Sequence, residues 1–497
     1  MKKNDKTKLP YFLLIMLALF FCWLFCIRNG VFGSKVDWIS QHSVFPDYFR
    51  QLFYDTGQIF PEFAANIGGG QNIYNFSYYG LYSPVILISY LFPNVEMGIY
   101  MMAAMIVNLL IALLLFYRWL LQRGISKRTS FLVVLLFLLS GPMIYHSYNQ
   151  VMFVNYMPFL CLALIGVDRY FEKQKVGIYT FSVWMMILTS YYFSIGGMLV
   201  LVLYGLYRYG ERKENSKEIF RIRTFLWDGI QFLFPMLTAV LLSAVLLVPT
   251  AFALMGVRTG GTSVSFWKLF VPDIQIFWLV YAPYGIGLTT LVITVLISGF
   301  TYKKRSEKWL HLGCAIILCV PVFAWLLNGG LYIRDKVMIP FLPLLCYLIA
   351  KYIEKQRSGE ISFLAGLLPF LFAVLLLCAK KEQIGNKGYW QLLLADGMIM
   401  AVCFLICYWK KCMQFLVLPP LIILSIYGAV LHENADMLID PVFYEQVTDQ
   451  NIRTVIEKIS EKETGFYRIE QSGTLEEDAA NINRIWSPEQ YVSSIYS

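Results

Sequence analysis

The chain has 497 residues, of which 58% are hydrophobic, 17% aromatic and only 15% charged. Soluble domains carry about 25% charged residues, so this composition, with its repeated long apolar stretches, excludes a soluble enzyme and indicates a polytopic membrane protein. The net charge of +9 fits an excess of Lys and Arg on the cytoplasmic side of a membrane better than it fits nucleic-acid binding.

The chain opens with a basic segment and an apolar run that no small-x-small cleavage site follows, which predicts a retained first membrane helix. About 20 apolar residues span a bilayer as a helix, and on that criterion we expect an all-α protein with thirteen spans. The predicted spans are 10–29, 98–118, 130–147, 151–168, 176–191, 194–209, 225–249, 284–301, 309–327, 337–353, 361–379, 391–409 and 413–431.

The distribution of basic residues orients these spans. With the N-terminus in the cytoplasm, most of the 41 Lys and Arg residues fall in short inner loops, as the positive-inside rule requires. We therefore expect a multi-pass protein of the cell membrane whose C-terminal tail lies outside the cell. Outer loops have no supply of ATP or nucleotide sugars, so any activated donor must arrive through the membrane.

The first outer loop, 30–97, is the longest connection, and loops of this length are usually functional. Residues 43–55 have apolar side chains at helical spacing, which predicts an interfacial helix capped by Ser43. The apolar run 81–93 is too short to span and suits a re-entrant or buried helix. Between them, "NIGGGQNIYNFSYYG" is compatible with a phosphate cradle, but a plain turn fits it better.

Asp37 is the strongest catalytic candidate in this loop. It lies between a spanning helix and an interfacial helix, so it is held near the headgroup plane, where a carboxylate can act as general base towards an acceptor hydroxyl. The alternative is a solvated loop aspartate. His42 is expected to be a hydrogen-bonding neighbour in the binding site.

For each of the other candidate residues on the outer face, an ordinary structural role is an alternative to a binding role. Arg334, Lys336 and Arg258 are candidates to bind a lipid phosphate, although Arg334, Asp335 and Lys336 also fit an exposed ion pair. His146, Gln150 and Asn155 are candidates to bind sugar hydroxyls, or belong to an ordinary interfacial belt. Asp396 is an acid within an apolar segment, and such acids are functional candidates, but partial solvation is also compatible with its place near the outer end.

Several segments, in this order, resemble the bacterial YfhO family within the GT-C superfamily of glycosyltransferases. The segments are "GSKVDWISQHSVFPDYFRQLFYDTG", "NIGGGQNIYNFSYYGLYSPVILISYLFP", "GPMIYHSYNQVMFVNYMPFLCLALIGVDRY", "TSYYFSIGG", "NGGLYIRDK" and "FYRIEQSG". The resemblance covers essentially the whole chain.

The resemblance implies a GT-C-like helix bundle over 1–431 with Asp37 as the catalytic acid of the first outer loop. It implies transfer of a sugar from a polyprenyl (undecaprenyl) phosphate to a cell-wall polymer such as teichoic acid, beside a partner glycosyltransferase and a flippase. Many such enzymes pair two acids in this loop, whereas Trp38 follows Asp37 here. Family members are typically longer, so we expect 432–497 to be a small α/β tail that begins a larger outer domain, in a short form of the protein.

The resulting hypothesis is an inverting transfer in which Asp37 deprotonates the acceptor and polyprenyl phosphate leaves. The sequence has no Asp-x-Asp motif, so we expect neither an obligatory metal nor another cofactor. Two alternatives stay open. A transporter or flippase of the lipid-linked sugar would be expected to contain internal repeats, and none is convincing. A non-catalytic envelope scaffold would act through its tail.

Overall fold

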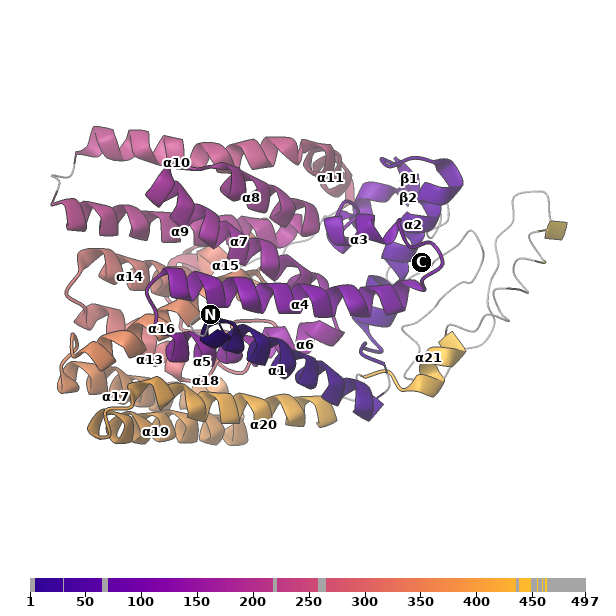
Figure 1. Cartoon of the computed structure of the whole chain (residues 1–497). Helices are drawn as coiled ribbons and strands as arrows, with labels where there is room; N and C mark the ends of the chain where they lie inside the picture. Colours follow the sequence, from indigo (N-terminus) through magenta and orange to yellow (C-terminus); the bar gives the residue numbers. More distant parts are fainter. Residues whose placement is uncertain are drawn as a thin grey trace.

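The computed structural model describes residues 5–29, 31–64, 70–217, 221–257, 265–434 and 438–447, together with Thr454, Lys458, Glu461 and Lys462. Most of these residues form helices that run side by side along one direction, and the elements of the first long loop extend from one end of this bundle (Figure 1). We call this the loop end, and the end that carries the α9–α10 connection the opposite end.

The bundle consists of apolar helices, which satisfy their own backbone hydrogen bonds and can therefore lie in lipid. Its elements are α1 (Asp5–Asn29), α4 (Met97–Gln122), α5 (Lys127–Leu138), α6 (Gly141–Tyr148), α7 (Met152–Lys173), α8 (Gly177–Thr189), α9 (Tyr191–Ser216), α10 (Ile222–Leu242), α11 (Ala244–Val257), α13 (Leu291–Ser298), α14 (Arg305–Cys319), α15 (Pro321–Leu327), α16 (Leu342–Ser358), α17 (Phe363–Ala379), α19 (Lys387–Trp409) and α20 (Leu418–Asn434). Short elements connect them: η3 (Phe266–Phe270), α12 (Ile276–Leu279), η4 (Gly299–Thr301), η5 (Lys336–Phe341), α18 (Lys381–Ile384) and η6 (Met413–Val417).

The structure confirms an all-α membrane protein. Each predicted span overlaps at least one helix, and among the described residues six helices are long and apolar enough to cross a membrane. The number rises to eight if the bent pairs α5–α6 (49°) and α14–α15 (75°) each count as one span. The other predicted spans correspond to shorter apolar helices, so the number thirteen stays a prediction.

Besides these bent pairs, the predicted spans 225–249 and 284–301 differ in detail from the observed helices. The segment 225–249 is divided at Ser243 into α10 and α11. The segment 284–301 is helical only from Leu291, because residues 280–290 form a loop whose backbone is paired between Val280 and Leu288.

Asp396 of α19 holds that loop in place. Its Oδ2 accepts hydrogen bonds of 2.8 Å from the Tyr281 hydroxyl and from the Thr290 backbone N–H. The residue is 1% exposed, so the alternative of partial solvation is wrong and the carboxylate is a buried anchor.

The first long loop folds into a small unit with its own core. It contains η1 (Trp38–His42), α2 (Val44–Thr56), the hairpin β1 (Phe63–Ala64) and β2 (Gln71–Asn72), η2 (Ile73–Tyr79) and α3 (Pro84–Ser89). The expected helix over 43–55 is therefore present as α2. Of the glycines between the strands, Gly68 and Gly69 lie outside the described residues.

Two expectations for α2 are wrong. Ser43 makes no capping bond to α2, because its hydroxyl donates instead to the Ile39 carbonyl of η1 at 3.1 Å. The aromatic face is not free to lie on lipid either, because Phe45 and Phe49 are buried against η2 in the protein interior. Protein packing of the aromatic face therefore competes successfully with the bilayer interface.

At the opposite end of the bundle, buried charges join the helices. Arg123, directly after α4, binds Glu211 of α9 at 2.7 Å, and Arg208 binds Asp168 of α7 at 3.2 Å. Breaking such a pair would leave an uncompensated buried charge, so this network strongly restricts how these helices can be arranged. A rigid bundle of this kind provides a fixed support for the loop end.

Residues 438–447 return to the first loop and include α21 (Pro441–Val447). The Ile439 N–H donates to the Gly33 carbonyl at 3.1 Å, and Ser34 and Leu438 form a β-bridge. The Tyr444 ring lies 6.3 Å from the Trp38 ring. This short segment, which we call the return segment, therefore packs on the residues that flank Asp37.

Candidate functional site

The backbone around Asp37 is held by neighbours on both sides. Ser34 Oγ accepts the Trp38 N–H at 3.1 Å and donates to Asn149 Oδ1 at 2.7 Å. Gly33 permits this fold, because a Cβ there would overlap the indole of Trp38, which is completely buried. The five residues after Asp37 form a π-helical turn, a geometry that is common at functional sites. Asp37 itself is only half-buried, so its carboxylate remains accessible.

The Asp37 carboxylate is oriented by amide side chains. Gln150 Nε2 donates to Oδ2 at 2.6 Å, Asn149 Nδ2 reaches the same oxygen at 3.5 Å, and Gln41 Nε2 donates to Oδ1 at 3.4 Å. Asn149 and Gln150 form the short break between α6 and α7, which points both amides towards the first loop. Within the described residues Asp37 makes no ion pair, so neutral donors fix its direction without neutralising its charge.

His42 lies beside Asp37 as a buried neutral imidazole. It is 3% exposed, its ring meets Tyr79 edge-on at 5.7 Å, and Nε2 has no hydrogen-bond partner among the described residues. Burial lowers the pKa of His42 to about 4, while the Asp37 carboxylate raises it and the Lys336 ammonium lowers it further. Both charges act on this imidazole. Lys336 is also linked to it by contacts, because Lys336 binds Tyr78, and the Tyr78 ring packs at 5.3 Å on the Tyr79 ring that meets His42.

Lys336 lies against two aromatic rings. Its ammonium is 5.0 Å from the centre of Tyr78 and 5.1 Å from that of Tyr192, and it donates to the Tyr78 hydroxyl at 2.9 Å. Burial first, then Tyr192 and the Asp37 carboxylate, raise the pKa of the Tyr78 phenol well above its usual value. The Tyr78 hydroxyl thus stays protonated, and it interacts both with the Lys336 ammonium and with the Asp37 carboxylate.

Arg334 and Asp335 precede Lys336 and have different roles. Asp335 Oδ1 accepts the Lys336 N–H at 2.9 Å at the start of η5, and burial raises the pKa of this carboxyl. Arg334 is exposed and lies over the Tyr332 ring at 5.8 Å. Burial raises the pKa of Tyr284, as does Asp37, whereas the exposed Arg334 lowers it, so both charges act on this phenol.

The remaining predicted residues are less directly connected to Asp37. His146 is fully buried, stacked on Phe153 at 4.0 Å and edge-on to Tyr284 at 5.0 Å, and Asn155 is 3% exposed near the start of α7. Arg258 lies outside the described residues. His146 therefore packs on Tyr284, and among the predicted binding residues Gln150 is the one that bonds directly to the Asp37 carboxylate in the described part of the chain.

Sequence reasoning missed the tyrosines of this site. Tyr78 and Tyr192 hold Lys336, and the Tyr284 hydroxyl accepts from Asn149 Nδ2 at 3.3 Å. The Tyr-Tyr pairs 78–79 and 191–192, which fall at predicted outer turns, were the available signal. In the described part of the chain no three His, Cys, Asp or Glu side chains gather as a metal site.

Comparison with known proteins gives a family and two structural likenesses. Residues 11–482 match the family described as bacterial membrane protein YfhO. The fold is similar to ArnT from Cupriavidus metallidurans, solved with undecaprenyl phosphate bound, at 11% identity and a TM-score of 0.46 over 94% of this chain and 83% of that one. It is also similar to the oligosaccharyltransferase of Archaeoglobus fulgidus in its apo form, at 11% identity and a TM-score of 0.41 over 84% of this chain and 56% of that one. No curated protein matches the sequence.

Proposed function

The chain belongs to the family of bacterial membrane protein YfhO, and from that premise we propose that it is a GT-C type glycosyltransferase. In this proposal it transfers a sugar from a polyprenyl phosphate, such as undecaprenyl phosphate, to a cell-wall polymer such as teichoic acid. The observation that supports it best is that a carboxylate and an ammonium lie around one group of rings. Asp37 precedes the turn that ends in His42, whose ring meets Tyr79. Tyr79 meets Tyr78 at 5.3 Å, and the Tyr78 hydroxyl accepts a hydrogen bond from Lys336.

These two charges suit the two groups that react at the anomeric carbon of the sugar: the carboxylate suits the attacking acceptor hydroxyl, and the ammonium suits the leaving phosphate. The acceptor hydroxyl gives its proton to the Asp37 carboxylate, its oxygen forms the new bond to the anomeric carbon, and the bond from that carbon to the phosphate oxygen breaks. The configuration at the carbon is inverted. The departing polyprenyl phosphate carries the negative charge, so a cation placed there stabilises the transition state.

Lys336 is the residue that we assign to the donor phosphate. Its ammonium lies against Tyr78 and Tyr192 and donates to the Tyr78 hydroxyl, and an ammonium is a compact charge that can donate three hydrogen bonds. Arg334, exposed at the rim, offers a planar fork that suits the same phosphate as the lipid enters.

Asp37 is suited to the role of base by its partners. The short bond from Gln150 fixes the direction of one carboxylate oxygen, and amide donors leave the group able to accept a proton. His42 does not fill this role in the proposal, because its buried ring has no room to approach an acceptor and is packed against Tyr79.

The function is tested by reconstituting the purified protein in liposomes with polyprenyl-phosphate-linked sugars and a teichoic acid acceptor. We expect sugar to be transferred to the polymer without any nucleotide sugar present. Movement of the lipid-linked sugar across the bilayer without transfer would contradict the proposal and support a flippase. Absence of both activities over a panel of sugars and acceptors would instead support the scaffold.

A further inference from the structure

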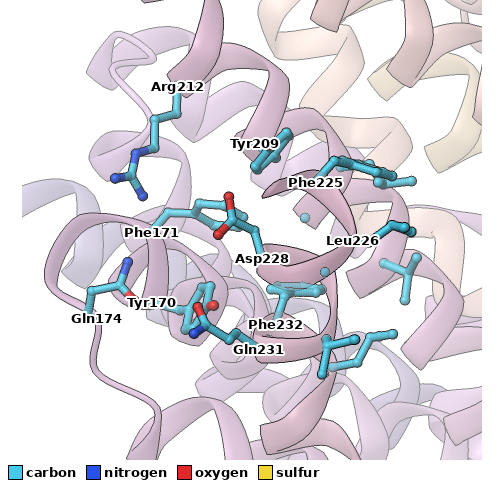
Figure 2. A pocket seen from close by; sticks show the side chains of 16 residues that line it. Tyr170, Phe171, Gln174, Tyr209, Arg212, Phe225, Leu226, Asp228, Gln231 and Phe232 are labelled. Carbon is cyan, nitrogen blue, oxygen red and sulfur yellow. The ribbon is translucent and has the colours of Figure 1, made fainter. Parts of the chain in front are cut away.

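A second candidate binding site lies at the opposite end of the bundle from Asp37. Between the last turns of α7 and α9 and the first turns of α10 the structure contains a cavity of about 330 Å³. Aromatic side chains form its walls, and polar side chains lie along one side, as Figure 2 shows. The aromatic residues are Tyr170, Phe171, Tyr209, Phe225 and Phe232.

The cavity exists because α9 and α10 meet closely at one level and leave space at the next. Gly205 of α9 accepts the ring of Phe232, and a Cβ at Gly205 would overlap that ring. One turn earlier in α10, a Cβ at Gly229 would meet no atom within 4 Å. The ring of Phe232 therefore closes one end of the cavity, and Gly229 borders its empty part.

The cavity is accessible from lipid. Leu226 and Leu233 line it and are 58% and 44% exposed, and further large apolar side chains of α10, such as Trp227 and Phe234, are more than 60% exposed. An exposed apolar surface of this kind on a membrane helix faces acyl chains. A lipid chain can thus enter between α10 and α9 from the bilayer.

Two opposite charges lie at the polar side. The carboxylate of Asp228 and the guanidinium of Arg212 both border the cavity, and in Figure 2 Asp228 is drawn near the centre beside Phe171, with Arg212 above and to the left of it. Neither forms an ion pair or a hydrogen bond with another residue in the described part of the chain. Gln174 and Gln231 add neutral amides.

We propose that this cavity binds a zwitterionic glycerophospholipid with a phosphoethanolamine headgroup. The Arg212 guanidinium takes the phosphate, the Asp228 carboxylate takes the ammonium, and one acyl chain lies along the aromatic wall. A guanidinium matches phosphate geometry well, and a charge-assisted bond from an ammonium to a carboxylate is short and strong. A singly anionic headgroup such as phosphatidylglycerol would face Asp228 without a cation to pair with it.

The position of the cavity along the bundle is suitable for a phospholipid headgroup. Basic residues gather at the same helix ends, including Lys173, Arg221 and Arg223, and the positive-inside rule places such an end in the cytoplasm. The site is then at headgroup level in the inner leaflet, away from the candidate catalytic residues of the loop end. It concerns a structural lipid, and it is independent of the function proposed above.

The test is native mass spectrometry of the full-length protein in micelles containing equimolar phosphatidylethanolamine and phosphatidylglycerol. We expect the wild type to retain phosphatidylethanolamine, and Asp228→Asn to reduce its preference over phosphatidylglycerol about ten-fold. Arg212→Gln should reduce retention of both lipids. Arg223→Gln, an exposed position of α10 that does not line the cavity, is the matched control and should behave as wild type.

Gly229→Leu provides a second variant that fills the cavity without altering a charge. We expect added phosphatidylethanolamine to raise the melting temperature of the wild type. Gly229→Leu should retain no lipid and should show no such rise. Retention of phosphatidylethanolamine by Asp228→Asn and Gly229→Leu at the wild-type level would overturn the proposal. Equal retention of the two lipids by the wild type would overturn it as well.

Discussion

Gln150 Nε2 donates a hydrogen bond of 2.6 Å to Asp37 Oδ2 across 113 positions of the chain. The bond joins the break between α6 and α7 to the start of the first long loop, so two separate segments orient one carboxylate. Its donor is a neutral amide, which fixes the direction of the oxygen while the carboxylate keeps its negative charge. Gln150 is thus a positioning residue in the proposed reaction.

Gln150→Leu should lower kcat about ten-fold or more and leave the KM for the lipid donor nearly unchanged, because misplacing a reacting group costs rate and not binding. Steady-state transfer in liposomes measures both constants. The control is Gln41→Leu, which removes the longer bond of 3.4 Å to the other oxygen and should have a smaller effect. A rise in KM with unchanged kcat would assign Gln150 to substrate binding instead.

Lys336→Met should raise the donor KM about ten-fold or more, because the donor phosphate loses a charge-assisted partner. Lys381→Met is the matched control, since Lys381 also lies over an aromatic ring, that of Trp390 at 4.9 Å, but on α18. Equal effects of the two substitutions on KM would contradict a specific phosphate contact at Lys336.

The return segment should matter for catalysis through the Asp37 loop. Ile439→Pro removes the N–H that donates to the Gly33 carbonyl, so we expect it to loosen Ser34 and Trp38 and to lower kcat several-fold. Val442→Pro, at an exposed position in the first turn of α21, introduces the same residue without that loss and should be nearly neutral. Wild-type kcat for Ile439→Pro would show that the segment is accessory.

The buried His42 should make the free energy of unfolding of the protein depend on pH. Its pKa is lowered to about 4 in the folded protein from the ordinary histidine value of 6.5, because burial disfavours the charged ring. As the pH falls, His42 therefore binds a proton in the unfolded protein before it does so in the folded protein. The folded protein loses stability as the pH falls from about 6.5 to about 4. Between pH 7 and pH 5 this amounts to about 2 kcal/mol.

Melting temperatures at pH 7 and pH 5 test this prediction. The wild type should lose more stability on acidification than His42→Gln, in which this titrating ring is absent and the other three histidines are unchanged. An identical decrease in both proteins would show that His42 does not carry this dependence.

Much of the fold could be predicted from apolar length and charge. Every predicted span overlaps a helix, α2 is present where the spacing of Phe45, Phe49 and Phe53 placed it, and the break at Ser190 lies next to the predicted boundary between the spans 176–191 and 194–209. The spacing of apolar residues does not report what covers them, which is why the aromatic face of α2 was assigned to the interface and lies in the protein core.

The site was less predictable, because its members come from distant segments. Asp37 was identified from its place after the first helix, yet nothing local indicates that Gln150 contacts it. Tyr78 and Tyr192 were missed, since tyrosines at outer turns are common in membrane proteins and only the fold brings these two around Lys336. The role of Asp396 depends likewise on Thr290, 106 positions away.

The role of Asp37 as base is the central claim, and one substitution tests it. Asp37→Asn keeps the shape of the side chain and removes the proton acceptor, so we expect sugar transfer from the polyprenyl-phosphate donor to fall about 100-fold or more. Asp55→Asn, an exposed acid of the same loop on α2, should transfer at the wild-type rate. Transfer is measured as sugar incorporated into the wall polymer by liposomes that hold equal amounts of each protein. A loss confined to Asp37→Asn is the predicted result, and transfer by Asp37→Asn at the wild-type rate would contradict the account.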